Sequence, residues 1–375
     1  MVFDGGATSV EHSCSAWFEA CQSLHIAPSL GIYPVSRFQG PWYSEGMRIL
    51  ILGGTRFLGR HLATESIGRG HALTLFDTDG SGVSAGGIED RVDTLQELSL
   101  HRWDACIDVS TRGAAAASEI ATVLAGQIEH YLYVSSVDVH LTNAVTAPRP
   151  ADGEGEELRG HGAAKREVEV ALRTALGERL TILRPGLIVG PHDQSGRFAY
   201  WIERAMTGAE FLAPAPYDAS IQLVDVRDVS RFALDLVEGR VAGEFDVVGP
   251  DRSLVFGEVI RSLIRVADPL SSVTWVDNGF LLDRGLRPWT DIPLWLTEEG
   301  PRSVVSIDST PAQAAGFHAR PFEETLGDTV EWFADRSDGA STAGYLECAR
   351  ERELLAEWHR SESLARQQLA AGHEI

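Results

Sequence analysis

Three side chains have the chemistry needed to exchange a proton with a small substrate. Ser136 follows an apolar run, and His161 and Lys165 stand four residues apart. A hydroxyl can hydrogen-bond a substrate oxygen, and an imidazole can donate a proton to it or accept one. Residues four apart project from one face of a helix. These residue types are also common on surfaces, so they indicate a site only together with the elements that position them.

A glycine-rich turn can bind phosphate. The segment 53–59, with the sequence GGTRFLG, follows the apolar run Ile49–Leu52 and opens a helical pattern. Glycine permits a tight turn and a close approach of backbone N–H groups to a pyrophosphate at a helix N-terminus. In the G-x-x-G-x-x-G spacing, arginine takes the middle position. The residues predicted to bind a dinucleotide here are Gly53, Thr55, Arg56, Phe57, Leu58 and Gly59.

The choice between NAD and NADP depends on two opposed charges. Asp77 lies 24 residues after Gly53, where a carboxylate accepts hydrogen bonds from the adenosine ribose and repels a 2′-phosphate. Arg56 acts in the other direction, because a guanidinium can pair with that phosphate. The balance favours NAD over NADP. Ser110, directly after the apolar run Ala105–Val109, is a further predicted cofactor-binding residue.

Short apolar runs alternate with helical patterns from Met47 onward, which predicts an α/β fold. Continuous apolar runs are typical of parallel strands covered on both faces, so we expect a Rossmann-type doubly wound parallel sheet. Right-handed crossovers bring the carboxyl ends of its strands to one edge, where a ligand should bind. The predicted elements are strands Ile49–Leu52, His71–Phe76, Ala105–Val109, Tyr131–Val134 and Leu180–Leu183, and helices around 113–126 and 162–176.

The chain is predicted to contain a cofactor domain and a smaller lobe. The cofactor domain covers 47–185, and residues 221–248 return to its sheet through strands at 222–226 and 245–248. The interrupted substrate lobe comprises 186–220 and 249–340, and an amphipathic C-terminal helix lies within 341–375. The lobe residues predicted to face the cleft are Arg197, Trp201, Arg204 and Gln222.

Composition excludes several classes of protein. The chain of 375 residues has 32 Lys and Arg against 54 Asp and Glu, a net charge of −22, which repels nucleic acid and anionic membranes. Its four cysteines are too few and scattered for a disulfide framework or a zinc site. Neither a membrane span nor a signal peptide is evident, which predicts a cytoplasmic protein. The N-terminal extension 1–46 is expected to be a packed arm or the result of a misplaced gene start.

Several stretches match the motifs of one family in order and spacing: MRILILGGTRFLGRHL, YLYVSSVDV, HGAAKREVE, ILRPGLIVGPHD, VDVRDV and GFHARPFEETLGDTVEW. From Met47 to about residue 335, the chain resembles an extended short-chain dehydrogenase/reductase of the NAD-dependent epimerase/dehydratase type. Its GGTRFLG form is similar to a branch that includes bacterial reductase- or epimerase-like proteins and the chloroplast stem-loop-binding proteins. The resemblance is specific for the superfamily and says little about the substrate.

The resemblance assigns roles to residues at the expected sheet edge. It implies that Ser136 and Lys165 match the catalytic Ser or Thr and the lysine of Tyr-x-x-x-Lys, and that Lys165 also binds the nicotinamide ribose. Pro185 and Leu187 would line the nicotinamide. The chain departs from the family at His161, which replaces the tyrosine that exchanges a proton with the substrate oxygen. The reference pKa of histidine is ~6.5, against ~10 for tyrosine, so a neutral imidazole able to give or take a proton is expected at pH 7.

Three interpretations of this departure stay open. The chain retains oxidoreductase or epimerase chemistry with His161 as acid and base, or it performs changed chemistry with other groups, or it binds a cofactor without turnover. Asp138 is the candidate for changed chemistry, because related sugar-nucleotide dehydratases carry a proton-abstracting Glu at that position, although the Asp that precedes it there is Val137 here.

The partners implied by the resemblance are small molecules. A nucleotide sugar is the common substrate class, while the Trp-rich lobe equally suits an apolar or polyketide-like ligand. A homodimer is possible. The alternative from another functional class is a binding or regulatory protein, associated with RNA by analogy with the stem-loop branch, and the net charge of −22 argues against it.

Overall fold

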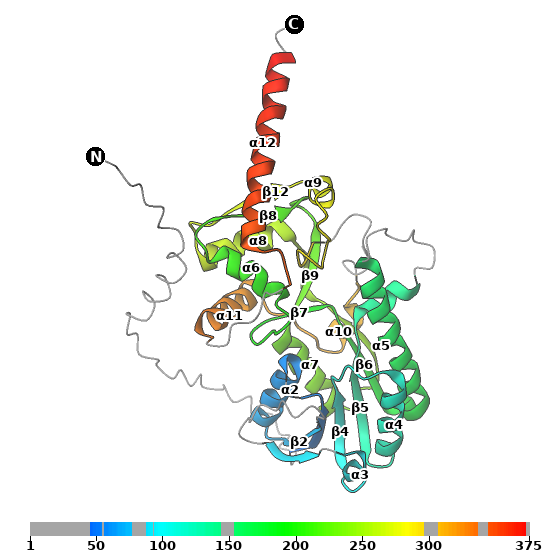
Figure 1. Cartoon of the computed structure of the whole chain (residues 1–375). Helices are drawn as coiled ribbons and strands as arrows, with labels where there is room; N and C mark the ends of the chain where they lie inside the picture. Colours follow the sequence, from blue (N-terminus) through cyan, green and yellow to red (C-terminus); the bar gives the residue numbers. More distant parts are fainter. Residues whose placement is uncertain are drawn as a thin grey trace, which may run out of the picture. The chain divides into compact units, whose positions relative to one another are not determined.

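A seven-stranded parallel sheet lies at the centre of the computed structural model, in the order β10-β6-β5-β4-β1-β2-β3 (Figure 1). The structure describes residues 46–54, 56–76, 88–92, 94–143, 154–295, 307–336 and 344–372. The strands are β1 (Arg48–Leu52), β2 (Ala72–Phe76), β3 (Ile88–Val92), β4 (Trp103–Asp108), β5 (Ile128–Val134), β6 (Leu180–Pro185) and β10 (Gly243–Val247).

Helices cover both faces of this sheet. On one face, α2 (Phe57–Gly68) and α7 (Val226–Glu238) share a core with Ile49 and Ile51 of β1. On the other face, α4 (Ala114–Leu124) and α5 (Glu154–Leu176) share a core with Leu50 and Leu52. This two-sided burial explains why β1 is continuously apolar from Ile49 to Leu52. The predicted doubly wound fold is confirmed, although α5 begins eight residues before the predicted start at 162 and β3 and α3 (Leu95–Leu98) were not predicted.

The strand order reverses between β1 and β4, and this is the topological switch point of the sheet. Strands β2 and β3 follow on one side of β1, while β5, β6 and β10 follow β4 on the other. In open parallel sheets, ligands bind in the crevice beyond the carboxyl ends of the strands at such a point. The segments after β1, β4 and β5 therefore decide what the protein can bind.

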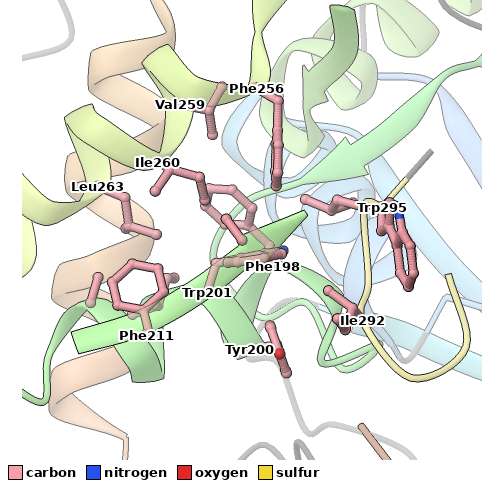
Figure 2. Close-up of a cluster of buried hydrophobic side chains, with 14 of the residues drawn as sticks. Phe198, Tyr200, Trp201, Phe211, Phe256, Val259, Ile260, Leu263, Ile292 and Trp295 are labelled. Atoms are coloured by element: carbon pink, nitrogen blue, oxygen red, sulfur yellow. The ribbon is translucent and has the colours of Figure 1, made fainter. Parts of the chain in front are cut away.

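A second lobe has its own hydrophobic core. It contains a three-stranded sheet, a two-stranded parallel sheet and five helices. A compact group of aromatic and aliphatic side chains fills it (Figure 2). Its elements are β7 (Leu187–Val189), α6 (Arg197–Ala205), β8 (Glu210–Pro214), β9 (Ser220–Asp225), β11 (Gly249–Val255), α8 (Phe256–Ala267), β12 (Ser272–Val276), α9 (Asn278–Leu282), α11 (Phe322–Asp335) and α12 (Cys348–Gly372).

Two predictions about this lobe were wrong. The strand predicted at 222–226 does not return to the central sheet, because β9 pairs with β7 and β11 and β10 occupies the place beside β6. Within the predicted lobe segment 249–340, α10 (Thr310–Ala314) instead contributes Ala312 to the core under α2 and α7. The predicted C-terminal helix is present as α12. No helix in the described ranges is both long and apolar enough to cross a membrane.

Candidate active site

The backbone of the turn after β1 is tightly packed. Gly53 has a φ of +82°, a conformation that side-chain-bearing residues rarely adopt, and its N–H donates to the carbonyl of Phe76 at 3.1 Å. A Cβ on Gly53 would lie 3.2 Å from the Cα of Ser110, so the segments after β1 and β4 touch at the switch point. Only glycine allows this approach without displacing the chain.

Gly59 brings the first turn of α2 against the same backbone. A Cβ there would lie 2.6 Å from the carbonyl oxygen of Gly53 and 2.6 Å from the Cα of Gly54. No side chain caps the N-terminus of α2, and its first turn contains no acidic residue. Its first N–H groups and the positive end of the helix dipole therefore suit an anionic group. The geometry fits the pyrophosphate of a dinucleotide.

The remaining predicted residues of this turn differ in their surroundings. The Leu58 side chain is buried in the core, so only its backbone is available to a ligand. Phe57 packs edge-on against His61, with ring centroids 6.3 Å apart. Arg56 is the exposed residue that precedes α2. Thr55 and Asp77 lie outside the described residues, so the charge balance that favours NAD stays a prediction.

Ser110 follows β4 and is buried. Its N–H donates to Oδ1 of Asp108 at 2.9 Å, and the Tyr131 hydroxyl donates to Oδ2 at 2.7 Å. The buried Asp108 carboxylate thus ties the end of β4 to β5. Asp108 was not among the predicted site residues, although an acidic residue at the end of an apolar strand was a visible signal.

Lys165 reaches from α5 to the end of β5. Its Nζ donates to the carbonyl oxygen of Val134 at 3.0 Å and lies 5.0 Å from the centroid of the Tyr133 ring. Burial lowers the pKa of Lys165 below the ordinary value of a lysine, while the carboxylates of Asp108 and Glu169 oppose the shift. The ammonium group is therefore fixed at the carboxyl edge of the sheet.

An ionic network centred on the buried Glu169 stabilises the carboxyl edge of the sheet. Glu169 of α5 accepts hydrogen bonds from Ser135 Oγ at 2.6 Å and from Arg184 Nε at 2.8 Å. Burial alone would raise the pKa of Glu169, but the hydrogen bonds from Arg184 and Ser135 hold it below its ordinary value. Arg184 also pairs with Glu244 of β10. The network joins α5, β5, β6 and β10, and none of these contacts follows from the sequence pattern.

Asp138 and His161 form a hydrogen-bonded pair near Ser136. Asp138 Oδ2 lies 2.9 Å from His161 Nδ1, and the two side chains are 13% and 49% exposed. The half-buried Ser136 accepts the N–H of Asp138 on its Oγ at 3.2 Å, so its own O–H remains able to donate. The structure therefore joins two predicted residues, Asp138 and His161, that the sequence analysis had assigned to separate interpretations.

Gly162 makes this pairing possible. A Cβ at this buried position would lie 2.1 Å from the carbonyl oxygen of Asp138. The 3-10 helix η1 (Val137–Asn143) therefore packs directly on α5. The sequence analysis missed Gly162, and the available signal was an isolated glycine inside a helical pattern, which often marks a close backbone approach.

Pro185 and Leu187 lie where the central sheet ends and the lobe begins. Pro185 closes β6, and the intervening Gly186 donates its N–H to the carbonyl of Val247 at 2.9 Å. A Cβ on Gly186 would lie 2.9 Å from Cγ1 of Val248, so this backbone is also tightly packed. Leu187 is half-buried at the start of β7. Their contact with a nicotinamide stays a prediction.

Two predicted substrate residues do not face a cleft. Trp201 is fully buried within the lobe core, and its indole N–H donates to the carbonyl of Pro293 at 3.0 Å (Figure 2). Arg204 is 3% exposed, and its Nε donates to Oε2 of Glu351 at 2.9 Å. The prediction for both is wrong, because α6 turns them inward to the core and to α12.

The other two predicted substrate residues are partly exposed. Arg197, the first residue of α6, places its guanidinium 5.2 Å from the ring centroid of Trp289. The Gln222 side chain pairs with the backbone of Ile307, at 3.4 Å to its N–H and 3.5 Å to its carbonyl oxygen. A substrate contact for either residue stays a prediction.

No protein-family model matches the sequence. A curated relative is the chloroplast stem-loop binding protein of 41 kDa b from Arabidopsis thaliana, 27% identical over 229 residues, which are 55% of this chain and 60% of that protein. The chain thus spans less than two thirds of the relative's length. The match confirms the predicted resemblance to the stem-loop-binding branch.

Solved structures with the same fold include a sugar-nucleotide epimerase and an enzyme that was solved with NAD and UDP. UDP-glucose 4-epimerase from Thermotoga maritima, solved with UDP-glucose, is 19% identical, with a TM-score of 0.54 over 77% of this chain and 99% of that one. The Bordetella bronchiseptica enzyme WbmG, solved with NAD and UDP, is 17% identical, with a TM-score of 0.59 over 81% and 98%. At these identities the likeness shows the fold, and it confirms the Rossmann-type fold that the extended short-chain dehydrogenase/reductase resemblance predicted.

Proposed function

We propose that this chain is an NAD(P)-dependent oxidoreductase or epimerase that acts on a hydroxyl or carbonyl group of a small molecule, with His161 in place of the family tyrosine. The observation that carries the proposal is the glycine turn at the switch point, which shares its sheet edge with Lys165. A fold in common with a sugar-nucleotide epimerase and with an enzyme solved with NAD and UDP supports it.

In this proposal, one group of residues binds the cofactor and another transfers the proton. The backbone of 53–59 and the N-terminus of α2 hold the pyrophosphate, and Lys165 holds the nicotinamide ribose. Ser136 donates its O–H to the substrate oxygen, and His161 takes or returns the proton of that oxygen. When bound, the nicotinamide supplies a hydride acceptor or donor.

We further propose NAD as the cofactor and a nucleotide sugar as the substrate class. Asp77 supports NAD through its expected repulsion of a 2′-phosphate. The substrate class is supported by the neighbours that were solved with UDP-glucose or with NAD and UDP.

The proposal is tested by comparing the unaltered protein with His161→Phe. Titrations with NADH and NADPH are followed by nucleotide fluorescence, and turnover is followed with NAD⁺ and UDP-glucose as the probe. We expect NADH to bind more tightly than NADPH, and to bind the variant equally well, because residue 161 lies outside the pyrophosphate turn. Turnover should fall by about 10²–10⁴-fold, the usual contribution of an acid–base group. Full activity of the variant would refute the role of His161, and absence of NADH and NADPH binding would refute the function.

A second candidate function is a nucleotide-binding regulatory protein without turnover. It is favoured by the match to a relative whose name describes stem-loop binding. Retention of a stem-loop RNA at low salt by the purified protein would support it. Absence of retention, which the net charge of −22 leads us to expect, would remove it.

A further inference from the structure

His161 meets its carboxylate through a different nitrogen from the other paired histidines. In the described part of the chain, three further histidine–carboxylate pairs are formed, all through Nε2: His71–Glu238, His140–Asp246 and His359–Glu210. His161 alone among these four presents Nδ1, which lies 2.9 Å from Asp138 Oδ2. The nitrogen left away from the carboxylate is therefore Nε2.

This geometry fixes which nitrogen can accept a proton. An ionised carboxylate accepts hydrogen bonds and does not donate them, so Nδ1 of His161 carries the hydrogen. In the neutral ring, Nε2 then has a free lone pair for a proton acceptor role. The His161 side chain is 49% exposed, whereas Asp138 is 13% exposed. The pair thus has a fixed inner end and an accessible outer end.

The backbone holds Asp138 in this position. Its N–H donates to Ser136 Oγ at 3.2 Å, and its carbonyl oxygen lies against Gly162, where a Cβ would come within 2.1 Å. The first contact ties η1 to the segment that follows β5, and the second packs η1 against α5. The same arrangement places Asp138 beside the residue that follows His161 in the helix, so any displacement of η1 separates the pair.

We propose that Asp138 is the positioning residue of His161, and that together they form a carboxylate–imidazole pair whose Nε2 exchanges the proton with the substrate hydroxyl. This inference rests on the proposed function. In the oxidative direction, the substrate O–H bond breaks and an N–H bond forms at Nε2. The hydrogen on the carbon that bears this oxygen leaves with its electron pair as hydride to the oxidised nicotinamide, and the alcohol becomes a carbonyl. Asp138 stabilises the imidazolium that results.

The tautomer of His161 is a readout that does not depend on activity. In protein labelled with ¹⁵N-histidine, at a pH where the rings are neutral, His161 should show the Nδ1–H tautomer, with its signals assigned by their loss in His161→Phe. His71 is the internal reference for the opposite tautomer, because its Nδ1 accepts the N–H of Met47 at 3.1 Å and its Nε2 faces Glu238.

Two substitutions separate the parts of the proposal. Asp138→Ala removes the acceptor, so His161 should change to the Nε2–H tautomer. Asp138→Asn keeps the size of the side chain and removes its charge, so turnover of UDP-glucose should fall about 100-fold with KM nearly unchanged. Glu238→Gln is the matched control, since it alters a carboxylate that faces His71 at the amino end of β2. It should change neither the His161 tautomer nor turnover.

The outcomes distinguish this inference from the proposed function. An Nε2–H tautomer of His161 in the unaltered protein overturns the inference, as does an unchanged tautomer in folded Asp138→Ala. Wild-type turnover of Asp138→Asn overturns it as well. Absence of NADH binding by the unaltered protein instead refutes the proposed function, whatever the tautomer. If Asp138→Ala does not fold, the tautomer of the unaltered protein and the kinetics of Asp138→Asn decide.

Discussion

Replacement of Gly59 by alanine tests whether the turn after β1 binds the cofactor. The new Cβ would lie 2.6 Å from both the Gly53 carbonyl oxygen and the Gly54 Cα, where ordinary contact begins at 3.4 Å. The neighbours are backbone atoms, so the start of α2 must move by about 0.8 Å. A misplacement of about 1 Å can cost about 100-fold in rate at a catalytic site, and we take the same scale as the upper bound for the loss of affinity here. We therefore expect NADH affinity to fall by about 10–100-fold.

The control lies in the same helix. Gly68 is the last residue of α2, and a Cβ there would meet nothing within 4 Å. Gly68→Ala should therefore bind NADH as the unaltered protein does. Both variants are measured by NADH fluorescence titration, with circular dichroism to show that each is folded. Unchanged affinity in Gly59→Ala, or an equal loss in Gly68→Ala, would refute the assignment of the turn.

Two further predictions concern stability. Burial and the charge of Arg240 lower the pKa of His130 from 6.5 to about 4. The unfolded state therefore binds the proton more readily than the folded state. As the pH falls from 6.5 to about 4, the free energy of unfolding should decrease by about 3 kcal/mol in total. His130→Gln should weaken this dependence in urea unfolding at a series of pH values, and an unchanged slope would contradict it. Arg204→Ala should destabilise the fold by about 3–5 kcal/mol, because it leaves the buried carboxylate of Glu351 without its cationic partner. NADH binding and substrate KM should not change in this variant. A large rise in KM would instead support the prediction that Arg204 contacts the substrate.

The part of the fold around the central sheet could be predicted because its signals are local. β1 is apolar at four successive positions since both faces of the sheet are covered, and Gly59 is required by its contact with the backbone of Gly53 and Gly54 a few residues away. Each of these features leaves a mark in a short window of sequence. The turn, its helix and their place at the sheet edge follow from that window and from the right-handed crossover rule.

The lobe could not be predicted in the same way because its contacts join distant parts of the chain. Arg204 was assigned to the substrate as a charged residue near the expected cleft, but its partner Glu351 is 147 residues away on α12. Nothing in the sequence near Arg204 indicates that pairing. The strand at 222–226 was misplaced for the same reason, since its partners β7 and β11 are chosen by the packing of the lobe.

The proposed replacement of the family tyrosine by His161 changes what the neighbouring residues must do. A phenol has a reference pKa of ~10 and needs a nearby positive charge to act as a base near pH 7, whereas an imidazole, at ~6.5, needs a partner that fixes its tautomer and stabilises its charged form. Asp138 at 2.9 Å from Nδ1 meets the second need. In the proposed mechanism, Lys165, whose Nζ donates to the Val134 carbonyl at 3.0 Å and whose pKa is lowered by burial, serves binding rather than the activation of a phenol. Restoring a tyrosine at 161 alone would therefore leave Asp138 facing a group that it cannot assist.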